Sequence, residues 1–234
     1  MPESLRWGQD GPGVLLVHGF TGKPSDLAAF GERLGTAGYR VLAPWLAGHG
    51  MGPFELAQAT AHAWRRSAEL GLMQLVEENP RGGAAVLGLS LGGMLAVDLA
   101  ARFPVRALVC VNPAAGVQRK AAVMAPYLWR IVPFVKIGPD AEDRLSVHAV
   151  AELVRATRES AGEAPKVRAP ALVLQSQDDP TVRPEASKLL FARIGSREKE
   201  FEMLPSHEHI PRHDAEEFVR RTAAFLNRHL GGAS

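Results

Sequence analysis

The sequence predicts one α/β domain whose core is a mainly parallel, doubly wound sheet. Short apolar runs bounded by turn residues recur along the chain, and such runs are typical of strands buried on both faces. Stretches with helical spacing of apolar residues separate them, and strands that alternate with helices form parallel sheets. The length of 234 residues, with 46% hydrophobic and 22% charged residues, suits a single globular domain of this class.

Apolar runs predict six strands along the chain. They cover residues 14–17, 39–43, 84–87, 107–111, 171–174 and 201–204. The first helix is expected to begin with Ser25 as its N-cap, to bury Phe30 and Leu34, and to end at Gly38. A second helix, carrying Trp64 and the leucines from 56 to 75, should precede the strand at 84–87.

The remaining helices follow from the same signals. A helix over 93–100 comes directly after the strand at 84–87. The last helix is expected to begin at Asp214, with Glu217 completing a capping box, and to bury Phe218 and Phe225.

The segment at about 112–168 interrupts the alternation of strands and helices. It is too long for one crossover, and no convincing strand is visible in it. Residues 127–134 are unusually apolar, and a more polar helix is expected over 147–159. Long insertions in compact domains are usually functional, so we expect this segment to form a small helical cap over the carboxyl-terminal edge of the sheet. The whole chain, 1–234, is then a single domain with this cap inserted. The alternative is ordinary core helices joined by a long loop.

Composition excludes some partners and compartments. The formal net charge of +2 is small and the basic residues are scattered, so no nucleic-acid partner is expected. Cys110 is the only cysteine and lies in an apolar run, which indicates a buried hydrophobe and no intramolecular disulfide. Neither a secretory signal nor a membrane-spanning run is visible, so we expect a cytoplasmic protein without a stable membrane anchor. The oligomeric state is unknown from the sequence.

Residues 88–92, Gly-Leu-Ser-Leu-Gly, are the strongest candidate for a catalytic motif. A strand, a forced turn with Ser90 at its tip and a helix make a nucleophile elbow, in which the serine backbone is strained. Gly88 and Gly92 would be needed because side chains there would collide with the neighbouring strand and helix. The pentapeptide alone is a weak signal, and its strand–helix context makes it specific. The alternative is a glycine-rich turn with an exposed serine.

A serine nucleophile needs a base, and the base needs an orienting acid. Asp178 and Asp179 follow the strand at 171–174, and His207 and His209 follow the strand at 201–204. Sites in parallel α/β sheets lie at the edge where the carboxyl ends of the strands meet. The chain order serine, aspartate, histidine is the one that α/β-hydrolases use.

These motifs together resemble the α/β-hydrolase family, in its group of small carboxylesterases and monoacylglycerol lipases. The matching pieces are residues 18–22 (His-Gly-Phe-Thr-Gly), 48–50 (Gly-His-Gly), 88–93, 175–184 and 206–214. The resemblance implies an α/β-hydrolase fold with Ser90 as nucleophile, Asp179 as acid and His209 as base. Asp178 is the alternative acid. The family often has Gly or His where this chain has Glu208, which leaves His207 as the alternative base.

Two backbone N–H groups should stabilise the oxyanion of the reaction. Leu91, the residue after the nucleophile, supplies one, and the family pattern assigns the other to Phe20, whose ring would also line the acyl pocket. His18 is expected to hold this loop by hydrogen bonding, and His49 is expected to be structural.

Other chemistries find little support in the sequence. The histidines from 207 to 213 do not form a zinc motif, because Pro211 occupies the position of its second histidine and breaks the helix that the motif needs. No phosphate loop or dinucleotide fingerprint is present, and no cofactor is implied.

The resemblance implies hydrolysis of a small-molecule carboxylic ester through an acyl-enzyme. It favours short-to-medium acyl chains or monoacylglycerols, bound by Phe20 and beneath Tyr127, Trp129 and Phe134 of the cap. The alternative is that these cap aromatics are only the core of the cap. A thioesterase or acyltransferase with the same three residues, and a non-enzymatic ligand-binding protein on this fold, also remain open.

Overall fold

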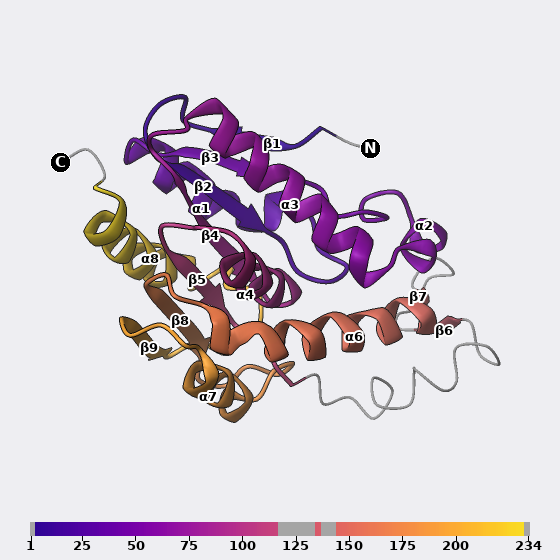
Figure 1. The fold of residues 1–234 in the computed structure, drawn as a ribbon. Helices are drawn as coiled ribbons and strands as arrows, with labels where there is room; N and C mark the ends of the chain where they lie inside the picture. The colour runs from indigo at the N-terminus through magenta and orange to yellow at the C-terminus, as the bar shows by residue number, and fades with distance from the viewer. Residues whose placement is uncertain (1–2, 117–133, 137–143, 232–234) are drawn as a thin grey trace.

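The computed structural model describes residues 3–116, 134–136 and 144–231. A seven-stranded sheet forms its centre, in the order β1-β3-β2-β4-β5-β8-β9 (Figure 1). All neighbouring strands are parallel except β1 and β3. The strands are β1 (Leu5–Trp7), β2 (Gly13–Val17), β3 (Arg40–Ala43), β4 (Ala84–Leu89), β5 (Leu108–Val111), β8 (Ala171–Ser176) and β9 (Lys199–Leu204). The mainly parallel, doubly wound sheet predicted from the sequence is therefore confirmed.

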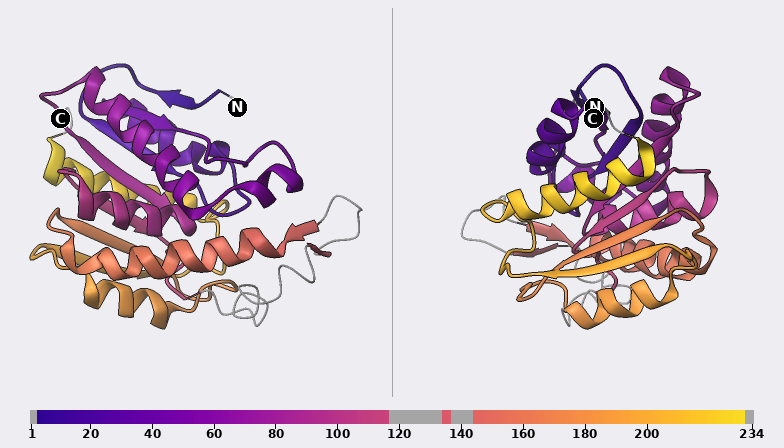
Figure 2. Two further views of the ribbon diagram at one scale, coloured as in Figure 1. Left: turned by 45° about the vertical axis from the view of Figure 1, so that its right-hand side comes forward. Right: turned by 90° about the vertical axis from the view of Figure 1, so that its left-hand side faces the viewer.

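Helices cover both faces of the sheet (Figures 1 and 2). Two of them pack on one face, α1 (Ala28–Thr36) and α8 (Ala215–Leu230). The opposite face carries α3 (Ala61–Glu78), α4 (Leu91–Arg102), α6 (Val147–Glu163) and α7 (Pro184–Arg193). The sheet thus separates two apolar layers, and its carboxyl-terminal edge stays free for loops.

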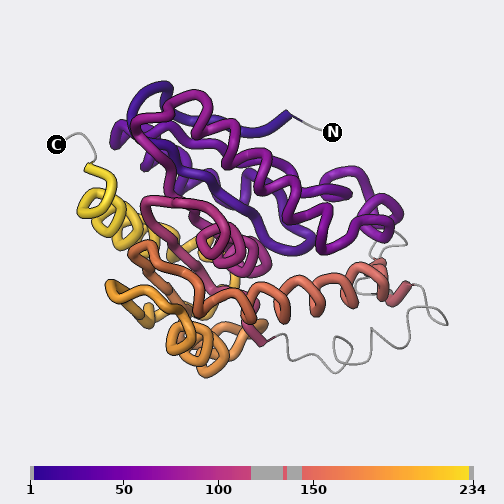
Figure 3. The backbone as a smooth tube through the Cα atoms, in the orientation of Figure 1, coloured from indigo at the N-terminus to yellow at the C-terminus, as the bar shows by residue number. Residues whose placement is uncertain are grey.

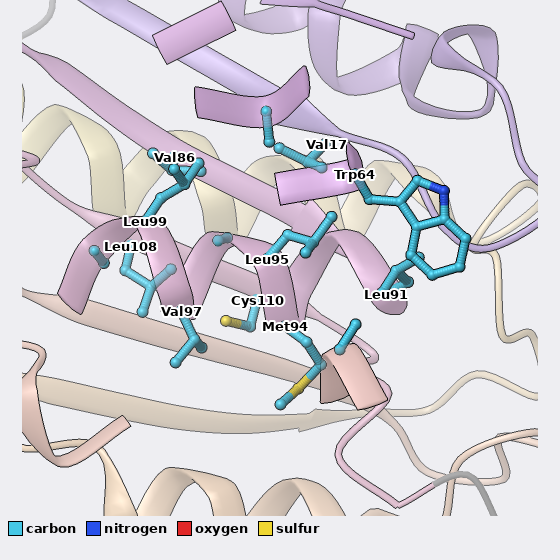
Figure 4. Packing of buried hydrophobic residues seen from close by; sticks show 14 of the residues in the cluster. Val17, Trp64, Val86, Leu91, Met94, Leu95, Val97, Leu99, Leu108 and Cys110 are labelled. Atoms are coloured by element: carbon cyan, nitrogen blue, oxygen red, sulfur yellow. The ribbon is translucent and has the colours of Figure 1, made fainter. Parts of the chain in front are cut away.

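Helix α4 lies at the centre of the larger apolar layer (Figure 4). All its residues from 91 to 100 are buried, because the sheet lies on one side and α3 and α6 lie on the other. Met94 and Leu95 pack in this layer together with Val86 of β4 and Cys110 of β5. Cys110 is fully buried, which confirms that this cysteine is a buried hydrophobe, and burial raises the pKa of its thiol to about 12.

The single helix expected around residues 56–75 is in fact two helices, α2 (Pro53–Gln58) and α3. The break lies at Ala59 and Thr60, which have extended backbone. The Thr60 hydroxyl caps α3 by accepting a hydrogen bond from the Ala63 N–H at 3.2 Å. In the sequence, the helical spacing of apolar residues continues through this break, so the spacing gave no sign that Thr60 is a helix cap.

Neither of the two predicted helix caps makes the hydrogen bonds that were expected of it. Ser25 lies inside a short 3₁₀ turn, η1 (Pro24–Leu27), and it is the Asp26 carboxylate that accepts a hydrogen bond from the Lys23 N–H. Asp214 is the N-cap of α8, but its side chain makes no capping bond. Glu217 pairs with two arginines of its own helix and does not complete a capping box.

The described parts of the insertion differ from the expectation in one respect. β6 (Phe134–Lys136) and β7 (Arg144–Ser146) form a small antiparallel ladder where no strand was expected. The expected helix is α6, which extends to Glu163, contacts α2 and packs on α4 (Figure 3). Tyr127 and Trp129 lie outside the described residues.

A second short 3₁₀ turn, η2 (Ala164–Lys166), follows α6 and leads into β8. Across the described residues, no helix combines the length and apolar character that crossing a bilayer would take.

Candidate active site

Ser90 occupies the sharp turn between β4 and α4. Its backbone has φ 55° and ψ −116°, a strained conformation for a residue with a side chain. Two hydrogen bonds hold the turn: the Ser90 N–H donates to the Val111 carbonyl at 2.9 Å, and the Ala114 N–H donates to the Ser90 carbonyl at 3.0 Å. The turn is thus anchored on both sides to the chain that leaves β5.

Glycines let three backbone segments approach at this turn. A Cβ on Gly88 would collide with the backbone of Gly92, and a Cβ on Gly92 would collide with the Val17 carbonyl. These are the collisions with helix and strand that the sequence predicted. A Cβ on Gly19 would lie 3.3 Å from the Ser90 Cβ, so the loop after β2 lies directly beside the serine.

His209 connects Ser90 to Asp179. Its Nε2 lies 2.8 Å from the Ser90 Oγ, and its Nδ1 lies 2.8 Å from an Asp179 carboxylate oxygen. A carboxylate only accepts hydrogen bonds, so the partners assign the proton to Nδ1 and leave Nε2 to accept from the serine hydroxyl. This tautomer leaves a basic nitrogen facing the hydroxyl.

The Asp179 carboxylate is fully buried and fully hydrogen-bonded. One of its oxygens accepts from the N–H groups of Thr181 and Val182, at 2.7 and 2.9 Å. The other, which faces His209, also accepts from the Gln175 amide at 3.4 Å. Donors to both oxygens fix the carboxylate in one orientation.

The alternative acid and base lie elsewhere. Asp178 and His207 contact each other at 3.2 Å on the surface, with side chains 54% and 84% exposed. The Glu208 carboxylate accepts hydrogen bonds from the N–H groups of Arg212 and His213, and pairs with the His213 ring. Of the two possible pairs, the structure brings only Asp179 and His209 to the serine.

The residues expected to hold an oxyanion flank Ser90. Leu91 is the first residue of α4, where the N–H has no acceptor within the helix, and Phe20 follows Gly19 in the adjacent loop. Among hydrogen bonds between described residues, neither the Leu91 nor the Phe20 N–H has an acceptor. Both donors are therefore available at this end of the sheet.

His18 holds the loop that carries Phe20. The ring Nε2 accepts a hydrogen bond from the Leu46 N–H at 3.1 Å, so Nδ1 carries the proton and donates to the Gly19 carbonyl at 2.9 Å. Burial lowers the pKa of His18 to about 4, which keeps the ring neutral. The expectation that His18 holds this loop by hydrogen bonding is confirmed.

Apolar side chains from the insertion pack against Phe20. A small cluster joins Phe20 to residues of β6, β7 and the first turns of α6, namely Val135, Leu145, Val147 and Val150. On its other side the Phe20 ring meets Trp64 edge-on, with ring centroids 5.8 Å apart. Phe134, expected to bind substrate, contacts the exposed Phe54 of α2 at 5.3 Å.

The sequence reasoning missed the polar residues that support these loops. Gln175 holds the Asp179 carboxylate and accepts a hydrogen bond from Ser187 of α7 at 2.5 Å. Asn112 contacts the loop of His209. Both residues are buried and polar, and both lie at the end of a strand. A polar residue that directly follows an apolar run was the sequence signal that could have identified them.

The parallel sheet, the elbow at Ser90 and the connection through His209 to Asp179 define the class of α/β-hydrolases. Comparison with known families agrees: a family model described as serine aminopeptidase, S33, matches residues 12–138 and 138–216, and the chain belongs to this family.

Two curated relatives and a solved structure are similar along most of their length. The thermostable monoacylglycerol lipase of Bacillus sp. (strain H-257) is 31% identical over 239 residues, which covers 96% of this chain and 94% of the lipase. The carboxylesterase of Bacillus subtilis (strain 168) is 23% identical over 210 residues, 84% of each chain. A structure from work on LipS and LipT, two metagenome-derived lipolytic enzymes, superposes with a TM-score of 0.89 at 30% identity, covering 97% of this chain and 98% of that one.

Proposed function

We propose that the protein hydrolyses carboxylic esters with Ser90 as nucleophile, His209 as general base and Asp179 as orienting acid. Membership among the carboxylic-ester hydrolases follows from the family and the relatives. The observation that carries the residue roles is the unbroken connection from the Ser90 hydroxyl through both ring nitrogens of His209 to Asp179, with both contacts at 2.8 Å.

The acylation step follows from this geometry. His209 accepts the hydroxyl proton at Nε2 while the Ser90 Oγ attacks the ester carbonyl. The Leu91 and Phe20 N–H groups donate to the oxyanion that forms. His209 then gives the proton to the leaving alcohol, and the acyl group remains on Ser90. Asp179 stays ionised and stabilises the imidazolium.

Deacylation repeats the same steps with water. His209 removes a proton from a water molecule, whose oxygen attacks the acyl carbonyl on Ser90. The tetrahedral species collapses to the free acid, and the proton returns through His209 to the serine. The enzyme therefore needs no cofactor for either half of this proposed reaction.

We propose short-to-medium-chain esters, including monoacylglycerols, as the substrate class. The monoacylglycerol lipase relative supports this proposal, as does the apolar cluster that joins Phe20 to the insertion. The segment 112–168 would act as the cap over the acyl group. In this arrangement Phe20 and Phe134 would contact substrate, together with Tyr127 and Trp129.

The test is turnover of p-nitrophenyl esters from acetate to palmitate, together with glycerol release from monoacylglycerols. Activity should peak at one chain length and disappear in Ser90→Ala. Retention of ordinary ester turnover in Ser90→Ala would contradict the mechanism. Fluorophosphonate labelling of Ser90 without ester turnover would instead favour a thioesterase, an acyltransferase or a receptor, and CoA release from acyl-CoA separates the first of these.

We also propose a cytoplasmic location. Its support is the cysteine content, because a chain with one buried thiol needs no oxidising compartment to fold. Cell fractionation with an antibody against the protein tests this, and recovery in an extracellular or membrane fraction would contradict it.

A further inference from the structure

Asn112 stands at the end of β5 in an unusual conformation. Its N–H donates to the Leu174 carbonyl at 2.9 Å, which continues the ladder between β5 and β8. The backbone then turns with φ 45°, in the left-handed region, and the side chain is fully buried. Asparagine tolerates this region better than most residues with a side chain, so the conformation alone restricts what can replace it.

The Asn112 side chain uses both ends of its amide. Its oxygen accepts from the Ser176 N–H at 2.7 Å, and its nitrogen donates to the His209 carbonyl at 2.8 Å and to the Ser176 hydroxyl at 2.9 Å. The same nitrogen lies 3.3 Å from the Glu208 carbonyl, which also accepts from the Ser176 hydroxyl at 2.6 Å. These partners fix the orientation of the amide, because a reversed group would face carbonyls with its oxygen.

Residues on both sides of Asn112 hold the turn of Ser90. The Val111 carbonyl accepts from the Ser90 N–H, and the Ala114 N–H donates to the Ser90 carbonyl. One short stretch of chain, 111–114, therefore contacts the nucleophile through its backbone and the loop of His209 through the Asn112 side chain. This stretch alone therefore connects the turn of Ser90 to the loop of His209.

We propose that Asn112 is a positioning residue: its amide fixes the His209 backbone relative to Ser90, and so sets the separation of Nε2 from the serine Oγ. This role rests on the reaction proposed above. Proton transfer depends steeply on such a separation, and a misplacement of about 1 Å can cost about 100-fold in rate. Asn112 touches neither reacting atom, so it acts only through His209.

The test uses two substitutions and a matched control. Asn112→Gly removes the side chain and tolerates the backbone conformation, whereas Asn112→Asp keeps the shape and loses the N–H donors. Asn79 serves as the control, because its side chain also joins two loops, donating to the Gly11 carbonyl at 2.9 Å and accepting from the Gly82 N–H at 3.1 Å. It does so at the opposite edge of the sheet, before β2 and β4.

The assay is hydrolysis of p-nitrophenyl butyrate, with active sites counted by fluorophosphonate labelling carried to completion. We expect kcat per labelled site to fall about 10- to 100-fold in both Asn112 variants, with KM changed by less than about twofold. The initial rate of labelling should fall in parallel, because the phosphonate reaction also needs the base. Asn79→Gly and Asn79→Asp should lower the melting temperature while kcat per site stays at the wild-type value.

Two results would overturn the inference. One is wild-type kcat and labelling rate per site in the Asn112 variants, and the other is an equal loss of kcat in the Asn79 variants. Because kcat is expressed per labelled site, both results can be interpreted even when part of a variant is unfolded. Failure of the proposed function would give a different result, namely ester turnover that survives Ser90→Ala. That result does not depend on the behaviour of the Asn112 variants.

Discussion

Two histidine–carboxylate pairs involve the loop after β9, and they differ in burial and in what the second ring nitrogen faces. In the inner pair, Asp179 is fully buried and the His209 side chain is 16% exposed. In the outer pair, Glu208 is 25% exposed and His213 is 90% exposed. Glu208 and His209 are neighbours in the chain after β9, whereas Asp179 follows β8, and only the inner pair reaches Ser90.

The local hydrogen bonding of the two carboxylates is nearly the same. Asp179 accepts from two successive backbone N–H groups and faces a histidine Nδ1, and so does Glu208. What differs is the other nitrogen: His209 Nε2 meets a serine hydroxyl at 2.8 Å. A histidine–carboxylate contact is thus no evidence of catalysis until the second nitrogen has a reactive partner in a water-poor site.

The largest expected effect comes from Asp179→Asn. An amide at this position donates to Nδ1, which moves the proton of His209 to Nε2 and removes the base from the serine. We expect kcat for p-nitrophenyl butyrate to fall about 10⁴-fold, with the fold retained. A loss below about tenfold would show that the inner pair is not the functional one.

A moderate effect is expected from Glu208→Gln, the matching change in the outer pair. The amide keeps one acceptor oxygen but loses charge, so the hydrogen bonds to the loop 208–213 weaken. We expect kcat to fall about fivefold and the melting temperature by about 2–4 °C, because the loop that carries His209 loosens. A loss as large as that of Asp179→Asn would remove the distinction between the pairs.

A smaller effect concerns the pH dependence of stability. The hydrogen bond from His213 lowers the pKa of Glu208 to about 2, and the same contact raises the pKa of His213 above 6.5. The carboxylate contribution is present above pH 4.5 and lost toward pH 2, and the histidine contribution is present below pH 6.5 and lost above its raised pKa.

The two contributions overlap between about pH 4.5 and 6.5. His213→Ala should therefore lower the melting temperature most in this window, by about 1–3 °C, and less at pH 8. Thermal melts across this range give the measurement, and 0.5 M NaCl should shrink the difference because the exposed pair is screened, as expected from a Debye length of about 3–8 Å. A difference that is independent of pH and salt would contradict this account of the outer pair.

The smallest effect is expected from His207→Ala, which removes the contact of His207 with Asp178. Both side chains are exposed, so the contact contributes little to stability. We expect less than about a twofold change in kcat and less than about 1 °C in melting temperature. Loss of activity comparable to that in Asp179→Asn would reinstate His207 as the base.

The sequence predicted the strand ends of the site well, because the apolar runs that make central strands stop where polar residues begin. The elbow at Ser90 and the glycines beside it follow from one pentapeptide in its context. The choice of His209 over His207 came from family resemblance. Sequence spacing alone could not make it, since both histidines follow the same strand and only tertiary contacts distinguish them.

Features without a periodic signal were harder to predict. β1 is a short edge strand with an exposed burial pattern, and α7 has an exposed leucine, Leu189, that obscures its inner face. The strands β6 and β7 have only three residues each. Asn112 left no pattern, because its role comes from a hydrogen bond to a residue 97 positions later in the chain.

The burial of Cys110 has a practical consequence for spectroscopy. Its thiol is the only one in the chain, and with a pKa of about 12 and no solvent exposure it will not react with maleimides at neutral pH. A cysteine introduced at one surface position would therefore carry a fluorophore or spin label without competition from the native residue. The environment and exposure of that label can then be followed during turnover on an otherwise wild-type background.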